Sequence, residues 1–281
     1  MNAFKAGLLI AALTGLFVAI GYFAGGTGGM VIGLVVAAVM NLGSYWFSDK
    51  IVIKMTKAQP VDERQAPELY EMVERLSERA RIPCPKIYIV PDPSPNAFAT
   101  GRSPEHGVVA VNQGLLNLLD RREVEGVVAH ELAHIKHRDT LTMAIVATLA
   151  GAIGVIGMML RFGAMFAGGR DGENVMASLA LAIFAPIMAM MVQMGVSRMR
   201  EYEADKMAAE LTQDPDGLRN ALVKLHNGVI REPGSIAPQA AHMCIVNPFA
   251  GLKGISNLFS THPPVEERVR RLESLRGQVS V

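Results

Sequence analysis

The sequence predicts a membrane protein that is mainly α-helical, with a small β-sheet and four transmembrane helices joined to one cytoplasmic domain. Three observations lead to this prediction. Half of the 281 residues are hydrophobic and only 19% are charged, which is unusual for a soluble globule. Four apolar runs have the length that a membrane-spanning helix needs, about 20 residues. The remaining polar sequence is long enough for one domain with its own core.

The four apolar runs form two hairpins. They cover Ala6–Ala24, Gly29–Ser48, Leu141–Leu160 and Asn174–Ser197. No charge interrupts residues 6–48, and the glycine-rich stretch Gly25–Gly29 is a natural turn, so the first two runs should be antiparallel. Two alternatives stay open. The first run has features of a signal peptide, and the third and fourth runs have the composition of buried helices in a soluble domain.

The orientation in the membrane follows from the basic residues that flank the outer ends of both hairpins. These are Lys5, Lys50, Lys54, Lys57, Lys136, Arg138, Arg198 and Arg200. The Gly25–Gly29 turn has no basic residue, and Arg170 in the second loop is offset by two carboxylates. Both termini and the polar domain are therefore expected in the cytoplasm.

This pattern divides the chain into three parts. Residues 1–48 form an N-terminal transmembrane hairpin, residues 49–140 and 198–281 form the cytoplasmic domain, and residues 141–197 form a second hairpin inserted into that domain. Within the domain, apolar residues at helical spacing predict a helix that contains Leu69, Met72, Val73 and Leu76. Strands are predicted at Lys86–Val90 and Gly107–Asn112, followed by a long helical stretch from Gln113 to Asp139.

A metal-binding pattern lies near the end of that helical stretch. His130 and His134 are four residues apart, which places both imidazoles on one helix face where one zinc ion can bind them. Glu131 lies about 100° further round the helix, where its carboxylate can serve as general base and acid. His-Glu-x-x-His also occurs by chance, but the surrounding apolar residues indicate a buried helix in which unpaired His and Glu side chains are costly.

The third ligand is expected from the helical segment Ser197–Leu211. Glu201 and Asp205 share one face of this helix, whereas Glu203 lies roughly opposite to Glu201. We therefore predict Glu201 as the ligand and Asp205 as a partner that orients a histidine. His137 is expected to support the site from one turn beyond His134 or to belong to the membrane interface, and Asp139 to hydrogen-bond near the site or at the bilayer surface.

The order of these parts resembles the HtpX family of membrane-bound zinc metalloproteases, relatives of the prenyl-protein CAAX proteases. The resemblance rests on "HELAHIKHRD" before the third apolar run, "SRMREYEAD" after the fourth, and "STHPPVEERVRRL" at Ser260–Leu272. It implies a zincin-like (gluzincin) protease domain that binds one Zn²⁺ ion per chain through His130, His134 and Glu201. It also implies that Glu131 is the general base, and that the chain is a multi-pass protein of the bacterial inner membrane.

The resemblance implies further roles that the residues alone do not indicate. Asn96, Ala97 and Phe98 belong to a segment that resembles the substrate-binding side of the family's site, although Asn96 is also a plausible turn residue after Pro95. His262 lies in the C-terminal motif, and it is expected either to stabilise the oxyanion of the reaction or to be a buried residue held by a turn.

The expected function is hydrolysis of misfolded or damaged membrane proteins on the cytoplasmic side. The alternatives are a CAAX-type processing protease and a non-catalytic scaffold that uses zinc only for folding. The net charge of +1 and the absence of a basic patch argue against nucleic-acid binding. The two cysteines lie far apart and predict neither a disulfide framework nor a thiolate metal site. The partners are therefore protein substrates and the lipid bilayer, and the sequence leaves the oligomeric state open.

Overall fold

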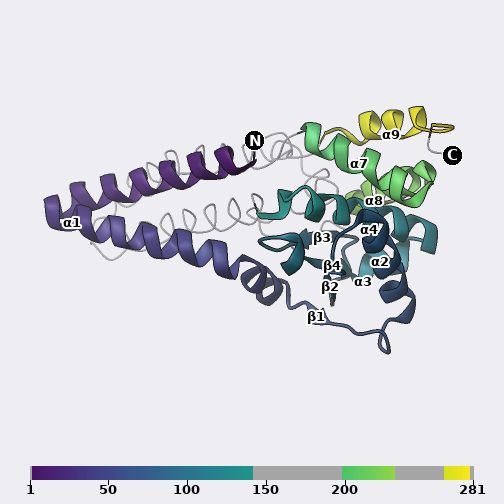
Figure 1. Cartoon of the computed structure of the whole chain (residues 1–281), viewed down its shortest axis with the longest axis horizontal. Coiled ribbons are helices and arrows are strands. Elements are labelled where there is room, and N and C mark those ends of the chain that lie inside the picture. Colours follow the sequence, from purple (N-terminus) through teal and green to yellow (C-terminus); the bar gives the residue numbers. More distant parts are fainter. Residues whose placement is uncertain (1, 142–197, 232–262, 279–281) are drawn as a thin grey trace.

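The N-terminal residues form a helical hairpin that extends away from a compact α/β domain (Figure 1). The computed structural model describes residues 2–141, 198–231 and 263–278. Within them the helices are α1 (Asn2–Thr56), α2 (Pro67–Ala80), α3 (Gln113–Leu118), α4 (Arg121–Lys136), α7 (Arg198–Thr212), α8 (Pro215–Arg231) and α9 (Val265–Ser274), with one turn of 3₁₀-helix at Pro104–His106. The strands are β1 (Gln59–Pro60), β2 (Lys86–Val90), β3 (Ala97–Thr100) and β4 (Val108–Asn112).

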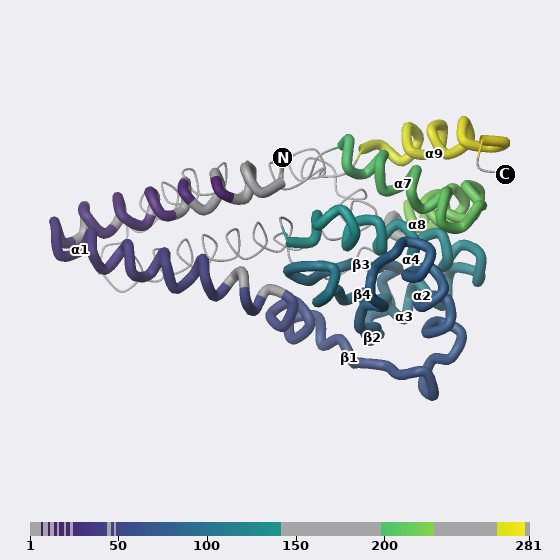
Figure 2. Tube along the Cα trace, viewed as in Figure 1, coloured from purple at the N-terminus to yellow at the C-terminus, as the bar shows by residue number. Residues whose placement is uncertain are grey.

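Helix α1 consists of two arms joined at the expected glycine turn, as the tube in Figure 2 shows. Gly26 has φ of 59°, a conformation that glycine adopts without strain. The arms approach so closely that a Cβ on Gly21 would lie 2.1 Å from the carbonyl oxygen of Gly29. Further from the turn, Asn41 donates a hydrogen bond of 3.1 Å to the Thr14 hydroxyl. The first two apolar runs are therefore antiparallel, as expected.

One helical stretch in the described part of the chain, Gly25–Gly43, is long and apolar enough to cross a membrane. Its side chains are largely exposed, including Val31, Ile32 and Val39, which distinguishes it from the core helix of a soluble domain. The third and fourth apolar runs lie outside the described residues, except for Leu141 at the start of the third run.

The sheet has the strand order β1-β2-β4-β3. Strands β2 and β4 are parallel, whereas β1 pairs antiparallel with β2 and β3 pairs antiparallel with β4. The sequence located β2 and β4 but missed β1 and β3, because each is too short for a period-two pattern to emerge. No described strand pairs with the outer edge of β3.

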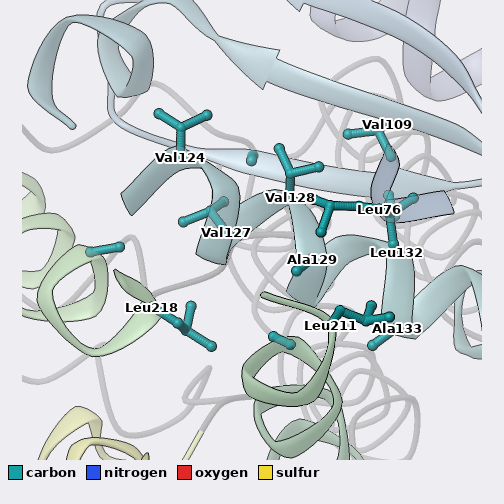
Figure 3. Packing of buried hydrophobic residues seen from close by; sticks show 14 of the residues in the cluster. Leu76, Val109, Val124, Val127, Val128, Ala129, Leu132, Ala133, Leu211 and Leu218 are labelled. Atoms are coloured by element: carbon teal, nitrogen blue, oxygen red, sulfur yellow. The ribbon is translucent and has the colours of Figure 1, made fainter. Parts of the chain in front are cut away.

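Helix α4 forms the centre of the hydrophobic core and packs against α2, α7, α8 and β3. Figure 3 shows Val124, Val128 and Leu132 of α4 among Leu76 of α2 and Val109 of β4, with Leu211 of α7 and Leu218 of α8 nearby. A glycine lets α8 approach, since a Cβ on Gly126 would lie 2.5 Å from the Leu218 nitrogen. A smaller cluster of Val52, Val90, Phe98 and Ala110 joins the end of α1 to the sheet.

One detail of the helices differs from the sequence prediction, and another agrees with it. The single helical stretch predicted for Gln113–Asp139 is two helices, because Asp120 is the N-cap of α4. Its side chain accepts a hydrogen bond from the Glu123 nitrogen, and the Glu123 carboxylate accepts one from the Asp120 nitrogen, which is the reciprocal capping box. The predicted helix around Leu69 and Leu76 is α2, and its four apolar marker residues are all buried.

Candidate metal centre

The predicted metal ligands lie between α4 and α7. His130, Glu131 and His134 are at most 5% exposed on α4, and Glu201 of α7 is fully buried. His130, His134 and Glu201 form a group whose possible ligand atoms all lie within 4.8 Å of one another. The two helices pack directly on each other, so the core that buries α4 also brings the Glu201 carboxylate to the two imidazoles.

The separations within this group fit a single small divalent ion. The two histidine Nε2 atoms are 3.1 Å apart. The Glu201 carboxylate oxygens lie 3.4 Å from Nε2 of His134 and 3.6 Å from Nε2 of His130. Two ligand atoms that each lie about 2.0–2.1 Å from a tetrahedral zinc ion are about 3.3 Å apart. Imidazole nitrogen and carboxylate oxygen are also the ligand types that such an ion binds.

The other ring nitrogen of each histidine is held by an aspartate. The Asp205 carboxylate lies 2.9 Å from Nδ1 of His130, and the Asp139 carboxylate lies 3.2 Å from Nδ1 of His134. A carboxylate at Nδ1 favours the tautomer with the proton on that atom, so that the lone pair of Nε2 faces the metal position. Glu203, by contrast, is exposed on the far side of α7.

Two arginines that the sequence analysis did not single out hold these aspartates. Arg268 of α9 is fully buried and donates to both oxygens of Asp205, at 2.8 and 2.6 Å. Arg200 of α7, also buried, donates to Asp139 at 3.2 Å. A signal for Arg268 existed in the sequence, since its spacing places it on the same face of α9 as Leu272, and a buried arginine requires charged partners.

The charges around His130 shift its pKa in the metal-free chain. Burial lowers the pKa of His130, but hydrogen bonds to Asp205 and Glu201 outweigh burial and raise it to about 9. Burial raises the pKa of Asp205, but the charge and hydrogen bonds of Arg268 outweigh burial and lower it. Burial likewise raises the pKa of Asp139, and its contacts with His134 and Arg200 lower it overall. Both aspartates are therefore ionised. At neutral pH His130 is a cation with a proton on both ring nitrogens, and metal binding displaces the proton on Nε2.

Metal affinity should consequently depend on pH. Below the His130 pKa of about 9, a proton competes with the metal for the imidazole. We expect the apparent dissociation constant for zinc to rise about tenfold for each pH unit below 9 down to pH 7. Titration against a chelator of known pH dependence, at pH 7, 8 and 9, measures this change. A dissociation constant that stays constant over this range would contradict a protonated His130 in the metal-free site.

The remaining predicted site residues lie in different places. His137 is exposed at the C-cap of α4, and its role, whether support of the metal site or a place at the membrane interface, stays a prediction. Although His137 shares a helix face with His134, the chain leaves the helix there, with Arg138 at φ of 60°. His262 lies outside the described residues.

The segment Asn96–Phe98 lies at the start of the edge strand. Asn96 accepts a backbone hydrogen bond of 2.9 Å from the Asn112 nitrogen and so extends the pairing of β3 with β4. Ala97 belongs to the core that contains α4, whereas Phe98 packs on the opposite face of the sheet against Val52 of α1. The segment is therefore a strand with both faces covered, and no described strand pairs with its outer edge.

Comparisons with known proteins agree with this geometry. The model of peptidase family M48 matches residues 63–276, which include both helices of the metal cluster. The chain is 48% identical to a protease HtpX homolog from Syntrophobacter fumaroxidans, with 98% of this chain and 99% of the relative covered. It is 50% identical to one from Salinibacter ruber, with 99% of both chains covered.

A solved structure shares the fold. The crystal structure of Ste24p from S. mikatae matches with a TM-score of 0.52 at 18% identity. The match covers 97% of this chain but only 65% of the Ste24p chain, so Ste24p contains a large part with no counterpart here. The family match, the buried His-His-Glu cluster and the exposed apolar hairpin lead to one conclusion: the chain belongs to peptidase family M48 and is a membrane metalloprotease.

Proposed function

We propose that this chain is a zinc-dependent endopeptidase that cleaves misfolded or damaged membrane proteins on the cytoplasmic side of the bacterial inner membrane. The observation that carries the proposal is the buried cluster of His130, His134 and Glu201 with Glu131 next to it on α4. One zinc ion per chain fits the three ligand atoms, and a tetrahedral ion with three protein ligands keeps a fourth position open for chemistry. The four-span topology and the division at residues 49, 141 and 198 belong to the same proposal.

Each group has a defined task in this mechanism. A bound zinc ion would polarise the scissile carbonyl and lower the pKa of the attacking water. The Glu131 carboxylate accepts a proton from that water and delivers it to the amine that leaves. Asp205 and Asp139 keep the two imidazoles in the tautomer that binds metal. His262, in the C-terminal motif, is proposed to donate a hydrogen bond to the oxyanion.

The outer edge of β3, with which no described strand pairs, supports binding of the substrate as an extended strand. The Asn112 nitrogen donates a hydrogen bond to the Asn96 carbonyl, so these two residues form a hydrogen-bonded pair of the antiparallel ladder. Because hydrogen-bonded and non-hydrogen-bonded pairs alternate, Phe98 and Thr100 form the next hydrogen-bonded pairs with β4. The N–H and C=O groups of Ala97 and Ala99 therefore point away from β4. An extended peptide can pair with these groups beside the metal cluster, because β3 packs directly on α4.

Replacing Ala99 with proline tests this edge. The change removes one outward N–H, and an edge position of this kind tolerates proline. Loss of one hydrogen bond to substrate should lower kcat/KM about tenfold. The matched control is Ala99→Gly, which removes a methyl group but keeps the N–H. Equal kcat/KM for the two variants on an unfolded substrate would show that the substrate does not pair with β3.

Contacts with α1 support a site close to the membrane surface. The guanidinium of Arg102, just after β3, lies 4.9 Å from the centre of the Trp46 ring near the end of the second apolar run. Thr140, one residue before the third run, donates a hydrogen bond of 2.9 Å to the Gly101 carbonyl. Tryptophan favours the boundary between lipid and water. The edge strand thus lies near the end of α1 and near Thr140, which precedes the third apolar run, and a segment that emerges from the bilayer could reach it there.

The experiment compares one unfolded segment in two settings. The purified chain, reconstituted in lipid vesicles with zinc, receives this segment either as a soluble peptide or fused to a single-span membrane protein in the same vesicles. We expect faster cleavage of the membrane-anchored form. Cleavage of the soluble form alone would overturn the membrane-protein substrate. No cleavage of either form by the zinc-loaded chain would overturn the endopeptidase itself.

A further inference from the structure

We propose that Arg200 and Arg268 are positioning residues, each of which fixes one metal-binding histidine through an aspartate. The first relay is the chain of contacts Arg268–Asp205–His130, and the second relay is the chain of contacts Arg200–Asp139–His134. This inference rests on the proposed function, because it assigns a task to residues around the same metal site. Neither arginine is one of the three residues of the ligand group.

The first relay ties the C-terminal helix to the metal site. The guanidinium of Arg268 binds both oxygens of Asp205, a two-point contact that fixes the plane of the carboxylate. The third guanidinium nitrogen, Nη1, lies 3.7 Å from the Glu201 carboxylate. Arg268 therefore borders two of the three ligands: it holds His130 mainly through the short contacts with Asp205, its Nη2 also lies 3.5 Å from both ring nitrogens of His130, and its Nη1 faces Glu201.

The second relay joins the two chain segments that flank residues 142–197. Asp139 lies on the segment that follows α4, and Arg200 lies in the first turn of α7, next to Glu201. Their contact of 3.2 Å is buried on both sides, so the pair is held in one geometry with little screening by water. The segment that leads into the third apolar run and the helix that follows the fourth are thus held together beside His134.

Burial makes both relays costly to disrupt. An aspartate buried without a cation would lose its charge or rotate toward water, and in either case the histidine that it holds would lose its orientation. Lysine carries the same charge as arginine but presents a single ammonium group, which cannot bind both carboxylate oxygens in one plane. An arginine-to-lysine change therefore separates geometry from charge.

The test measures zinc binding by the full chain purified in detergent. The variants are Arg268→Lys and Arg200→Lys, and the matched control is Arg270→Lys, an exposed position on the same helix as Arg268. Competition with a chelator gives the zinc dissociation constant, and the visible spectrum of the cobalt-loaded chain reports the ligand geometry. We expect each relay variant to weaken zinc binding by about 10–100-fold and to alter the cobalt spectrum, and the control to change neither.

A double variant separates positioning from a general loss of packing. If Arg268 acts through Asp205, then Asp205→Asn combined with Arg268→Lys should bind zinc no more weakly than Asp205→Asn alone. Additive losses would overturn the relay, and so would dissociation constants within twofold of the native value for both lysine variants. Failure of the native chain itself to bind zinc would instead overturn the proposed function. If Arg268→Lys does not fold, the zinc affinity and cobalt spectrum of Arg200→Lys still decide; if Arg200→Lys does not fold, Arg268→Lys and the double variant decide.

Discussion

Replacing Glu131 with glutamine is expected to lower the rate of peptide-bond cleavage by about 10²–10⁴-fold while zinc binding stays intact. Glutamine has nearly the same shape as glutamate but no site that accepts and returns a proton. Glu131 is buried beside the two histidines yet is not one of the three residues that form the ligand cluster. The measurements are single-turnover cleavage of an unfolded protein and the amount of zinc bound per chain.

The matched control for this change is Glu125→Gln, on the same helix. Glu125 pairs with Arg75 of α2 at 2.8 Å and takes no part in the metal cluster. The control should retain activity close to that of the native chain. If Glu131→Gln cleaved at the native rate, general-base catalysis by this residue would be wrong. If the native chain bound zinc but cleaved nothing, the scaffold with a structural zinc would become the better explanation.

Replacing Glu201 with glutamine should remove both zinc and activity. The neutral amide is a poor metal ligand, and only two imidazoles remain in the cluster. Because loss of a partner outside the ligands already costs about 10–100-fold in affinity, loss of a ligand should cost more than about 100-fold. The measurements are the zinc dissociation constant and the cleavage rate at saturating zinc.

The control for the ligand change is Glu203→Gln, two residues along the same helix. Glu203 is exposed and lies away from the cluster, so this variant should bind zinc and cleave substrate as the native chain does. Zinc affinity within tenfold of native in Glu201→Gln would identify a different third ligand. The comparison also separates ligand loss from any general effect on α7, since both changes have the same chemistry.

The sequence predicted those parts of the fold that repeat a pattern over many residues. The apolar spacing of α2 and the run of β-branched residues in β2 and β4 are long enough to be recognised, and the structure confirms them. The glycine turn of α1 was equally clear, because the stretch Gly-Gly-Thr-Gly-Gly separates two apolar runs. The short strand β3 was missed as an element, since its place in the sheet depends on pairing with β4 and not on its own sequence.

The metal cluster was visible for a related reason. His130, His134 and Glu131 lie within one helical turn and a half, where the fixed geometry of the helix converts spacing into direction. Arg200 and Arg268 lie on other helices, and only the packing of α4, α7 and α9 brings them to the aspartates. Spacing therefore predicts contacts within an element, whereas contacts between elements depend on the core.

Recognition at the outer edge of β3, with which no described strand pairs, would give a selectivity that does not depend on side-chain identity. A strand edge binds main-chain amides, which every polypeptide has, but only a segment that is already unwound can present them. A stable helix or a paired sheet keeps these groups occupied and offers nothing to bind. The conformation of a polypeptide would thus decide its fate: intact neighbours in the membrane would be spared without any recognition sequence, and a chain would become a target at the moment it loses its structure.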